Sequence, residues 1–244
     1  LQSGDQILIA SAAIEDSVPD VAQANALGCA RMTRAELLAD LFNAHPRSIA
    51  VGGTSGKSTV TGMIGWILTQ AGQDPTIMNG AVMKNFVADD APFASSRVGN
   101  GGIMISEVDE SDGSIALFDP EIAVLNNVSL DHKSLEELRQ LFGDFAGKAK
   151  HAIWNADDAE SIALVDGLNL SGAKSFGFSA PADYRATDIV EQPVSSSFTL
   201  TVDGQNYPVE MQVPGRHNIA NAMAAIAAAK AAGVALTDSI AALA

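Results

Sequence analysis

Residues 48–68, SIAVGGTSGKSTVTGMIGWIL, join an apolar run to a glycine-rich turn and then to a second apolar run that starts with a lysine and two hydroxyl residues. The first run predicts a buried strand over 48–52, and the second predicts a helix over 57–70. Glycines between a strand and a helix leave backbone N–H groups free at the helix N-terminus, where the helix dipole also favours phosphate. The stretch therefore predicts a nucleotide site, and the alternative is a tight turn with a surface lysine.

Two side chains of this turn suit phosphate chemistry. Lys57 can reach β- and γ-phosphate oxygens, and Ser58, with Thr59 beside it, offers a hydroxyl to Mg²⁺. The common phosphate-loop pattern G-x-x-x-x-G-K-[ST] is not fully met, because Val51 stands five residues before Gly56. The loop alone therefore leaves both interpretations open.

An acidic segment, SEVDESDG at residues 106–113, overlaps the end of an apolar run over 101–107 that predicts a second strand. Ligands of open α/β sheets bind at the carboxyl ends of the strands, and a carboxylate there can hold Mg²⁺ beside a phosphate loop. The alternative is a solvated turn in an acidic protein. The carboxylates in question are Glu107, Asp109, Glu110 and Asp112.

A histidine follows the next apolar run. Residues 121–127 predict a third strand, and Asp131-His132 in the segment NNVSLDHKS comes soon after it. A histidine at the carboxyl edge of the sheet can ligate a metal, act as a base or contact phosphate. A hydrogen-bonded structural role is the alternative for His132. A capping box of Ser134 and Glu137 then opens a helix.

An asparagine pair stands in the first turns of the alanine-rich helix predicted from about residue 217. His217-Asn218 lies at the helix start, and Asn221 follows one turn later. A side-chain amide presents both donors and an acceptor, which can pair with the edge of an adenine. The alternative is simple N-capping by Asn218.

The remaining pattern places these segments in an α/β fold. Strands predicted over 151–155 and 173–179 alternate with helices, which predicts a mostly parallel sheet with helices on both faces. Alternating apolar and polar residues around Asp203-Gly204 add an antiparallel hairpin.

The first 46 residues form a separate pattern. A strand is predicted over 6–13, a helix over 19–28, and a second helix after the capping box of Thr33 and Glu36. His45-Pro46 then breaks the chain, so we expect a domain boundary there.

The composition limits the classes of partner. The 244 residues include 29 acidic and 14 basic side chains, a formal net charge of −15, so no nucleic-acid footprint is expected. Cys29 is the single cysteine, which excludes an intrachain disulfide and fits a cytoplasmic protein. The N-terminus has no signal-peptide pattern, and Lys230 and Asp238 interrupt the alanine-rich C-terminal stretch, so no membrane span is expected. Both ends stop within a pattern, and we expect a fragment of a longer chain.

The four polar segments, taken in order, resemble the Mur ligase family. This family places its loop glycine at the position of Gly53, which accounts for Val51. The resemblance implies a central ATP-binding domain over 47–244, preceded by the C-terminal part of a UDP-sugar-binding Rossmann-like domain over 1–46, with the C-terminal ligase domain missing or just beginning. The matches are A-x-x-G-T-x-G-K-[ST] at 50–58, E-x-D-E-S-D at 107–112, N-x-x-x-D-H at 127–132 and G-R-H-N-x-x-N-A at 215–222.

The resemblance also implies an activity. Mur ligases are ATP-dependent, amide-forming enzymes of peptidoglycan precursor synthesis in the cytoplasm. ATP phosphorylates the carboxylate of UDP-N-acetylmuramate, and the amine of an amino acid, here L-alanine, displaces phosphate from the acyl phosphate. The implied roles are a loop of Gly53, Thr54, Ser55 and Gly56, phosphate contact by Lys57, Mg²⁺ ligation by Ser58, Glu107 and His132, and an adenine site of His217, Asn218 and Asn221.

Two branches of the family share these signals. The segments DESDGS and VPGRHNIANA resemble the branch that adds L-alanine, whereas LNN at 125–127 and NGAVMKNF at 79–86 resemble the branch that attaches recycled murein tripeptide. Ser55 and Ser58 stand where both branches usually carry His and Thr, and Lys133-Ser134 also departs from their pattern. The amine substrate therefore stays open.

Other interpretations stay open as well. A ligase of the folylpolyglutamate or cyanophycin synthetase type has similar ATP-binding residues. An unrelated P-loop kinase has a similar loop. A non-catalytic ATP-binding fragment would also carry these motifs. A GTPase is disfavoured because no N-K-x-D motif occurs. Some branches carry a carbamylated lysine on the helix after the Asp-His, the helix on which Lys148 is placed, and the alternative for Lys148 is an ordinary ammonium. The oligomeric state is not predicted, and these residues alone are expected to be inactive.

Overall fold

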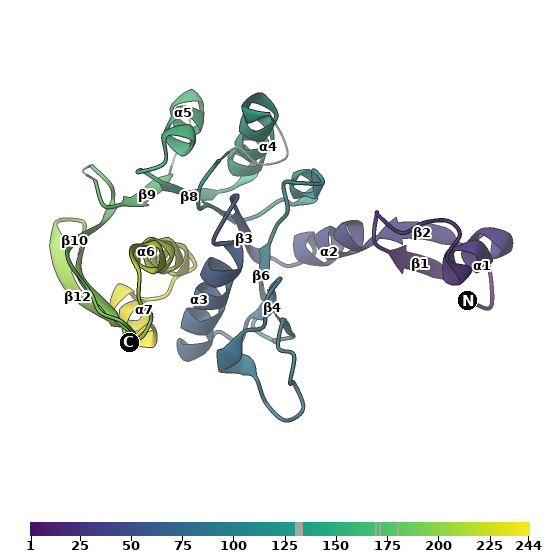
Figure 1. Cartoon of the computed structure of the whole chain (residues 1–244), viewed down its shortest axis with the longest axis horizontal. Coiled ribbons are helices and arrows are strands. Elements are labelled where there is room, and N and C mark those ends of the chain that lie inside the picture. Colours follow the sequence, from purple (N-terminus) through teal and green to yellow (C-terminus); the bar gives the residue numbers. More distant parts are fainter. Residues whose placement is uncertain (130–133, 169, 171, 180) are drawn as a thin grey trace. The chain divides into compact units, whose positions relative to one another are not determined.

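The chain divides into two compact units, Leu1–Ala44 and His45–Ala244. The structure, a computed structural model, describes residues 1–129, 134–168, 170, 172–179 and 181–244 (Figure 1). The division falls beside the chain break expected at His45-Pro46.

The first unit is a small β-α-β-α arrangement. Strands β1 (Ile7–Ala10) and β2 (Ala30–Thr33) pair in parallel, and helices α1 (Pro19–Leu27) and α2 (Arg34–Asn43) follow them. Gly28 ends α1 in the left-handed conformation, with φ of 69°. The capping box predicted for α2 is confirmed, because the side chains and backbones of Thr33 and Glu36 bond reciprocally.

The second unit is built on a ten-stranded sheet in the order β12-β11-β10-β9-β8-β7-β3-β6-β4-β5. The pairs from β10 through β4 are parallel, while β10, β11 and β12 pair antiparallel at one end and β5 pairs antiparallel at the other. The strands are β3 (Arg47–Gly52), β4 (Thr76–Met78), β5 (Ser96–Arg97), β6 (Ile103–Glu107), β7 (Ile122–Leu125), β8 (His151–Asn155), β9 (Lys174–Gly177), β10 (Tyr184–Glu191), β11 (Ser196–Val202) and β12 (Gln205–Met211).

Helices cover both faces of this sheet, which confirms the predicted fold class. One face carries α3 (Lys57–Gln70), α6 (Arg216–Ala231) and α7 (Leu236–Ala242), and the other carries α4 (Leu135–Lys148) and α5 (Ala159–Gly167) (Figure 1). Two short 3₁₀ turns, η1 (Lys84–Phe86) and η2 (Ser114–Leu117), complete the unit. Among the described residues, no helix combines the length and the apolar composition that crossing a bilayer requires.

Helix α6 is buried on nearly all sides. Its alanines, such as Ala222, Ala225 and Ala229, are fully buried between the sheet and α3. Small side chains let the helix approach its neighbours closely, and burial of the whole run stabilises it through the hydrophobic effect. This packing fixes the first turn of α6 beside the loop that opens α3.

Four strands were not predicted: β2, β4, β5 and β10. Strands β4 and β5 have only three and two residues, too few to show a period. Strand β10 carries a register shift between Thr187 and Val190, and Asp188 has φ of 51°. This irregularity interrupts the alternation, so the antiparallel end has three strands where a two-strand hairpin was predicted.

Candidate functional site

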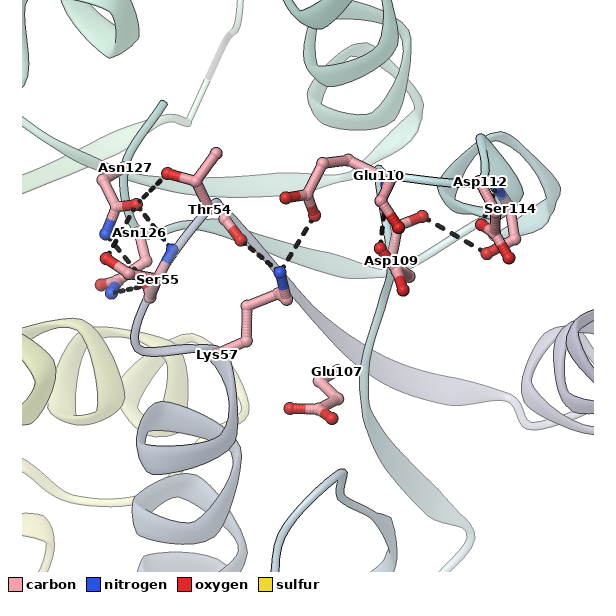
Figure 2. A network of polar contacts seen from close by, with 12 residues as sticks. Thr54, Ser55, Lys57, Glu107, Asp109, Glu110, Asp112, Ser114, Asn126 and Asn127 are labelled. Carbon is pink, nitrogen blue, oxygen red and sulfur yellow. Dashed lines mark hydrogen bonds and ion pairs between the residues drawn. The ribbon is translucent and has the colours of Figure 1, made fainter. Parts of the chain in front are cut away.

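The candidate site lies where three parallel strands end at one edge of the sheet. Strand β3 runs between β6 and β7, with Val51 opposite Glu107 and Gly52 opposite Leu125. The turn 53–56 that links β3 to α3 therefore lies beside the residues that follow β6 and β7 (Figure 2). This is the edge at which open α/β sheets bind ligands.

The turn requires glycine at two positions. Gly53 has φ of 130° and Gly56 has φ of 80°, both in the region that favours glycine. A Cβ on Gly56 would lie 2.5 Å from Asn126 Nδ2 and 2.8 Å from Asn221 Oδ1. Gly56 is also the N-cap of α3, so the free N–H groups of the first helical turn face the ligand edge.

Lys57 lies folded against its own loop. Its Nζ donates to the carbonyl oxygen of Gly53 at 2.7 Å and to Glu110 Oε2 at 3.0 Å (Figure 2). The Lys57 side chain keeps 21% of its surface exposed, whereas Glu110 keeps only 6%. The ammonium is therefore placed at the mouth of the loop, where the sequence predicts a phosphate contact.

Ser58 and Glu107 form the pair of oxygens expected for Mg²⁺. The Ser58 Oγ donates to Glu107 Oε2 at 2.6 Å. A hydroxyl and a carboxylate are hard oxygen ligands, and Mg²⁺ at nucleotide sites takes one or two such protein ligands beside phosphate oxygens. Gly80 leaves room for this carboxylate, because a Cβ there would overlap Glu107 Oε1. The donor set therefore fits the metal.

Two asparagines that were not predicted as site residues hold the loop. Asn127 Oδ1 accepts from Thr54 Oγ1 at 2.8 Å and from the Ser55 backbone N–H at 2.9 Å, while its Nδ2 donates to the Ser55 carbonyl at 3.0 Å. Asn126 Nδ2 donates to the same carbonyl at 2.9 Å (Figure 2). Both residues follow a strand at the ligand edge, and that position was the signal that could have identified them.

The acidic segment divides into two parts. Glu107 and Glu110 face the loop, whereas Asp109 and Asp112 accept from backbone N–H groups of their own turn, at Ser111 and Ser114. Burial raises the pKa of Asp109, but the hydrogen bonds from Ser111 and the charge of Lys57 outweigh it and keep the pKa below its usual value. Asp109 is therefore ionised at neutral pH and adds negative charge near the loop.

The first turn of α6 approaches the loop through one of its three predicted residues. Asn221, only 5% exposed, accepts from Asn126 Nδ2 at 3.1 Å. Asn218 does not cap the helix: Gly215 is the N-cap, and Asn218 Nδ2 donates to the Pro214 carbonyl at 2.7 Å. The His217 ring lies over Gly215, where a Cβ would come 2.6 Å from Cε1.

His132 and Lys148 were also singled out from the sequence, as a metal ligand and as a candidate for carbamylation. His132 lies outside the described residues. Lys148 Nζ donates to the Ala116 carbonyl at 2.7 Å and pairs with Asp119 Oδ1 at 2.9 Å.

The phosphate loop, the acidic segment and the start of α6 all lie within a region that a known family shares. The sequence pattern of the Mur ligase middle domain matches residues 51–229. The chain belongs to this family.

Relatives and solved structures agree with the family. A UDP-N-acetylmuramate–L-alanine ligase of Ruegeria pomeroyi is 32% identical over 251 residues, covering 99% of this chain and 52% of the relative. The UDP-N-acetylmuramate-alanine ligase of Thermotoga maritima has a TM-score of 0.83 at 24% identity, covering 97% of this chain and 54% of the other. A UDP-N-acetylmuramate:L-alanyl-gamma-D-glutamyl-meso-diaminopimelate ligase from Neisseria also scores 0.83, at 23% identity, covering 100% and 82%.

These two structural similarities establish the fold. The Mur ligase chain described here spans about half the length of the curated relatives it matches.

Proposed function

We propose that this Mur ligase domain binds ATP and Mg²⁺ within an enzyme that joins L-alanine to UDP-N-acetylmuramate. One observation carries the proposal: consecutive residues at the start of α3 supply an ammonium bonded to the glycine loop, from Lys57, and a hydroxyl paired with a carboxylate, from Ser58 to Glu107. A phosphate-binding cation and metal ligands at a helix N-terminus are the shared parts of phosphoryl transfer. Membership of the Mur ligase family assigns these parts to a ligase.

The residues act mainly by placing charge. Backbone N–H groups of the loop face the phosphates, and Lys57 brings a compact positive charge to the β- and γ-oxygens. Ser58 and Glu107 would hold Mg²⁺, which would supply positive charge beside the transferred phosphoryl group. His132 would assist at a second metal, and His217, Asn218 and Asn221 would lie at the adenine. Holding the substrate carboxylate in line with the γ-phosphate supplies the rate gain through proximity.

The substrate assignment rests on the relatives. The Ruegeria pomeroyi protein, 32% identical, is named for the L-alanine reaction, so we assign L-alanine as the amine. The cytoplasm is proposed as the compartment because the family resemblance implies it. The first unit, with its parallel β1–β2 pair, is assigned to the C-terminal part of a UDP-sugar-binding domain. Murein tripeptide is the second candidate, supported by the segment LNN, in which Asn126 contacts both the loop and α6.

Phosphate release tests the proposal. The full-length protein that contains this chain would receive ATP, Mg²⁺ and UDP-N-acetylmuramate, with L-alanine in one reaction and murein tripeptide in another. We expect release with L-alanine and at least about a tenfold weaker ATP affinity after Lys57→Ala, because charge-assisted hydrogen bonds are lost. Release only with the tripeptide would reassign the amine, and a Lys57→Ala protein with unchanged ATP binding would refute the site.

A further inference from the structure

Glu110 has a position that the proposed roles leave unexplained. Its carboxylate is almost completely buried, with 6% of the side chain exposed, yet it lies 3.0 Å from the Nζ of Lys57 (Figure 2). The neighbouring carboxylate Glu107 contacts Ser58, and the next acid in the turn, Asp112, is exposed. Among the acids of the segment, Glu110 is thus the one paired with the loop lysine.

The buried position restricts what nucleotide binding can do to this pair. A carboxylate that is removed from water and then loses its cation is left as an uncompensated buried charge, which strongly destabilises a protein. An incoming phosphate that simply took Lys57 away from Glu110 would create that state. Retention of the pair is therefore favoured over exchange.

The lysine has the capacity to serve both partners. An ammonium carries three N–H donors. The Gly53 carbonyl and Glu110 Oε2 occupy two of them, at 2.7 and 3.0 Å. One donor remains for a phosphate oxygen at the open side of the loop, and a long, flexible side chain held at two points loses less rotamer entropy when it binds.

We propose that Glu110 is a positioning residue, which holds the ammonium of Lys57 at the loop while the third donor of that ammonium binds the nucleotide phosphates. The proposal rests on the proposed ATP site. It makes a prediction of opposite sign to simple electrostatics, because removing a negative charge beside an anionic ligand should by itself strengthen binding.

Glu110→Gln and Glu110→Ala in the full-length protein test whether removing the Glu110 charge weakens or strengthens ATP binding. Binding of ATP with Mg²⁺ is measured by titration calorimetry, and kcat and KM are measured for each substrate. We expect ATP affinity to fall about tenfold in Glu110→Gln and further in Glu110→Ala, since Gln keeps an acceptor of the same shape. The KM for UDP-N-acetylmuramate should stay unchanged, which a general loss of structure would not allow.

Asp112→Asn is the matched control. It removes one negative charge from the same turn, at an exposed side chain that accepts from the Ser114 backbone N–H, and it should leave ATP affinity unchanged. Equal or tighter ATP binding in Glu110→Gln would overturn the proposal, as would an equal loss in Asp112→Asn. A wild-type protein that binds no ATP would instead contradict the ATP site itself.

Discussion

Asn126 and Asn221 are 95 positions apart in the sequence, and Nδ2 of Asn126 donates to Oδ1 of Asn221 at 3.1 Å. Both side chains are buried, and Asn126 Nδ2 also donates to the Ser55 carbonyl. The pair therefore joins the first turns of α6 to the phosphate loop. Asn126 Oδ1 is buried without a hydrogen-bond partner in the described part of the chain, so the geometry of this amide is set by its Nδ2.

The asparagine pair should be energetically coupled. Asn126→Ala and Asn221→Ala are each expected to destabilise the second unit by about 1–2 kcal/mol, because a buried polar partner is left unpaired. A double-mutant cycle should give a coupling of about 0.5–1.5 kcal/mol. Both tryptophans, Trp66 and Trp154, lie in the second unit, so urea unfolding followed by their fluorescence reports on it.

Asn218 provides the comparison for this cycle. Its amide donates to Pro214 and not to Asn126. Asn126→Ala and Asn218→Ala should therefore be additive within about 0.5 kcal/mol. Additivity of the Asn126 and Asn221 changes would show that the contact does not link α6 to the loop.

Gly56 should tolerate no side chain. Gly56→Ala places a Cβ in the left-handed region and against Asn126 Nδ2. We expect the free energy of unfolding to fall by more than about 2 kcal/mol, because the conformational penalty and the clash add. ATP binding measured by calorimetry should also be weaker. Gly72→Ala is the control, because Gly72 has φ of 74° but open space around a Cβ. Gly72→Ala should lower the free energy of unfolding by about 1 kcal/mol and leave ATP binding unchanged. Equal losses of stability in the two variants would show that the contact with Asn126 does not restrict Gly56.

Much of this site could be predicted because its signals are local. The start of α3 follows from the glycine at its N-cap, and the capping boxes of α2 and α4 depend on side chains that bond to their own backbone. The sequence could not predict which acidic side chains of the segment 107–112 face the loop, because this depends on how the turn after β6 folds onto the loop. Asn221 was expected at the adenine, and its contact with Asn126 arises only from tertiary packing of α6.

Ser58 should set the Mg²⁺ requirement. Ser58→Ala removes the hydroxyl that lies 2.6 Å from Glu107, so the Mg²⁺ concentration that gives half-maximal ATP turnover should rise by about tenfold, as for loss of one charge-assisted bond. Ser58→Thr keeps a hydroxyl and should restore a near wild-type requirement. A Ser58→Ala protein with an unchanged Mg²⁺ titration would remove Ser58 from the metal site.

Asp183 should make the second unit sensitive to acid. Its carboxylate accepts from the Ser175 backbone N–H at 2.8 Å, from Ser175 Oγ at 2.9 Å and from Lys174 Nζ at 2.9 Å. Burial raises the pKa of Asp183, but these hydrogen bonds and the Lys174 charge outweigh it, so the folded-state pKa lies below the usual value. The unfolded chain therefore binds the proton more readily than the folded protein. The stabilisation is complete at pH values above the unfolded-state pKa of about 3.9, and it is lost as the pH falls through the folded-state pKa.

Asp183→Asn measures this contribution. At about pH 7 the variant should be less stable than wild type by about 1 kcal/mol, a discounted figure for a partly exposed ion pair with backbone hydrogen bonds. The difference should shrink as the pH falls through the folded-state pKa, because the wild-type carboxyl then also becomes neutral. A constant difference between Asp183→Asn and wild type across the titration would mean that the Asp183 charge does not stabilise the fold.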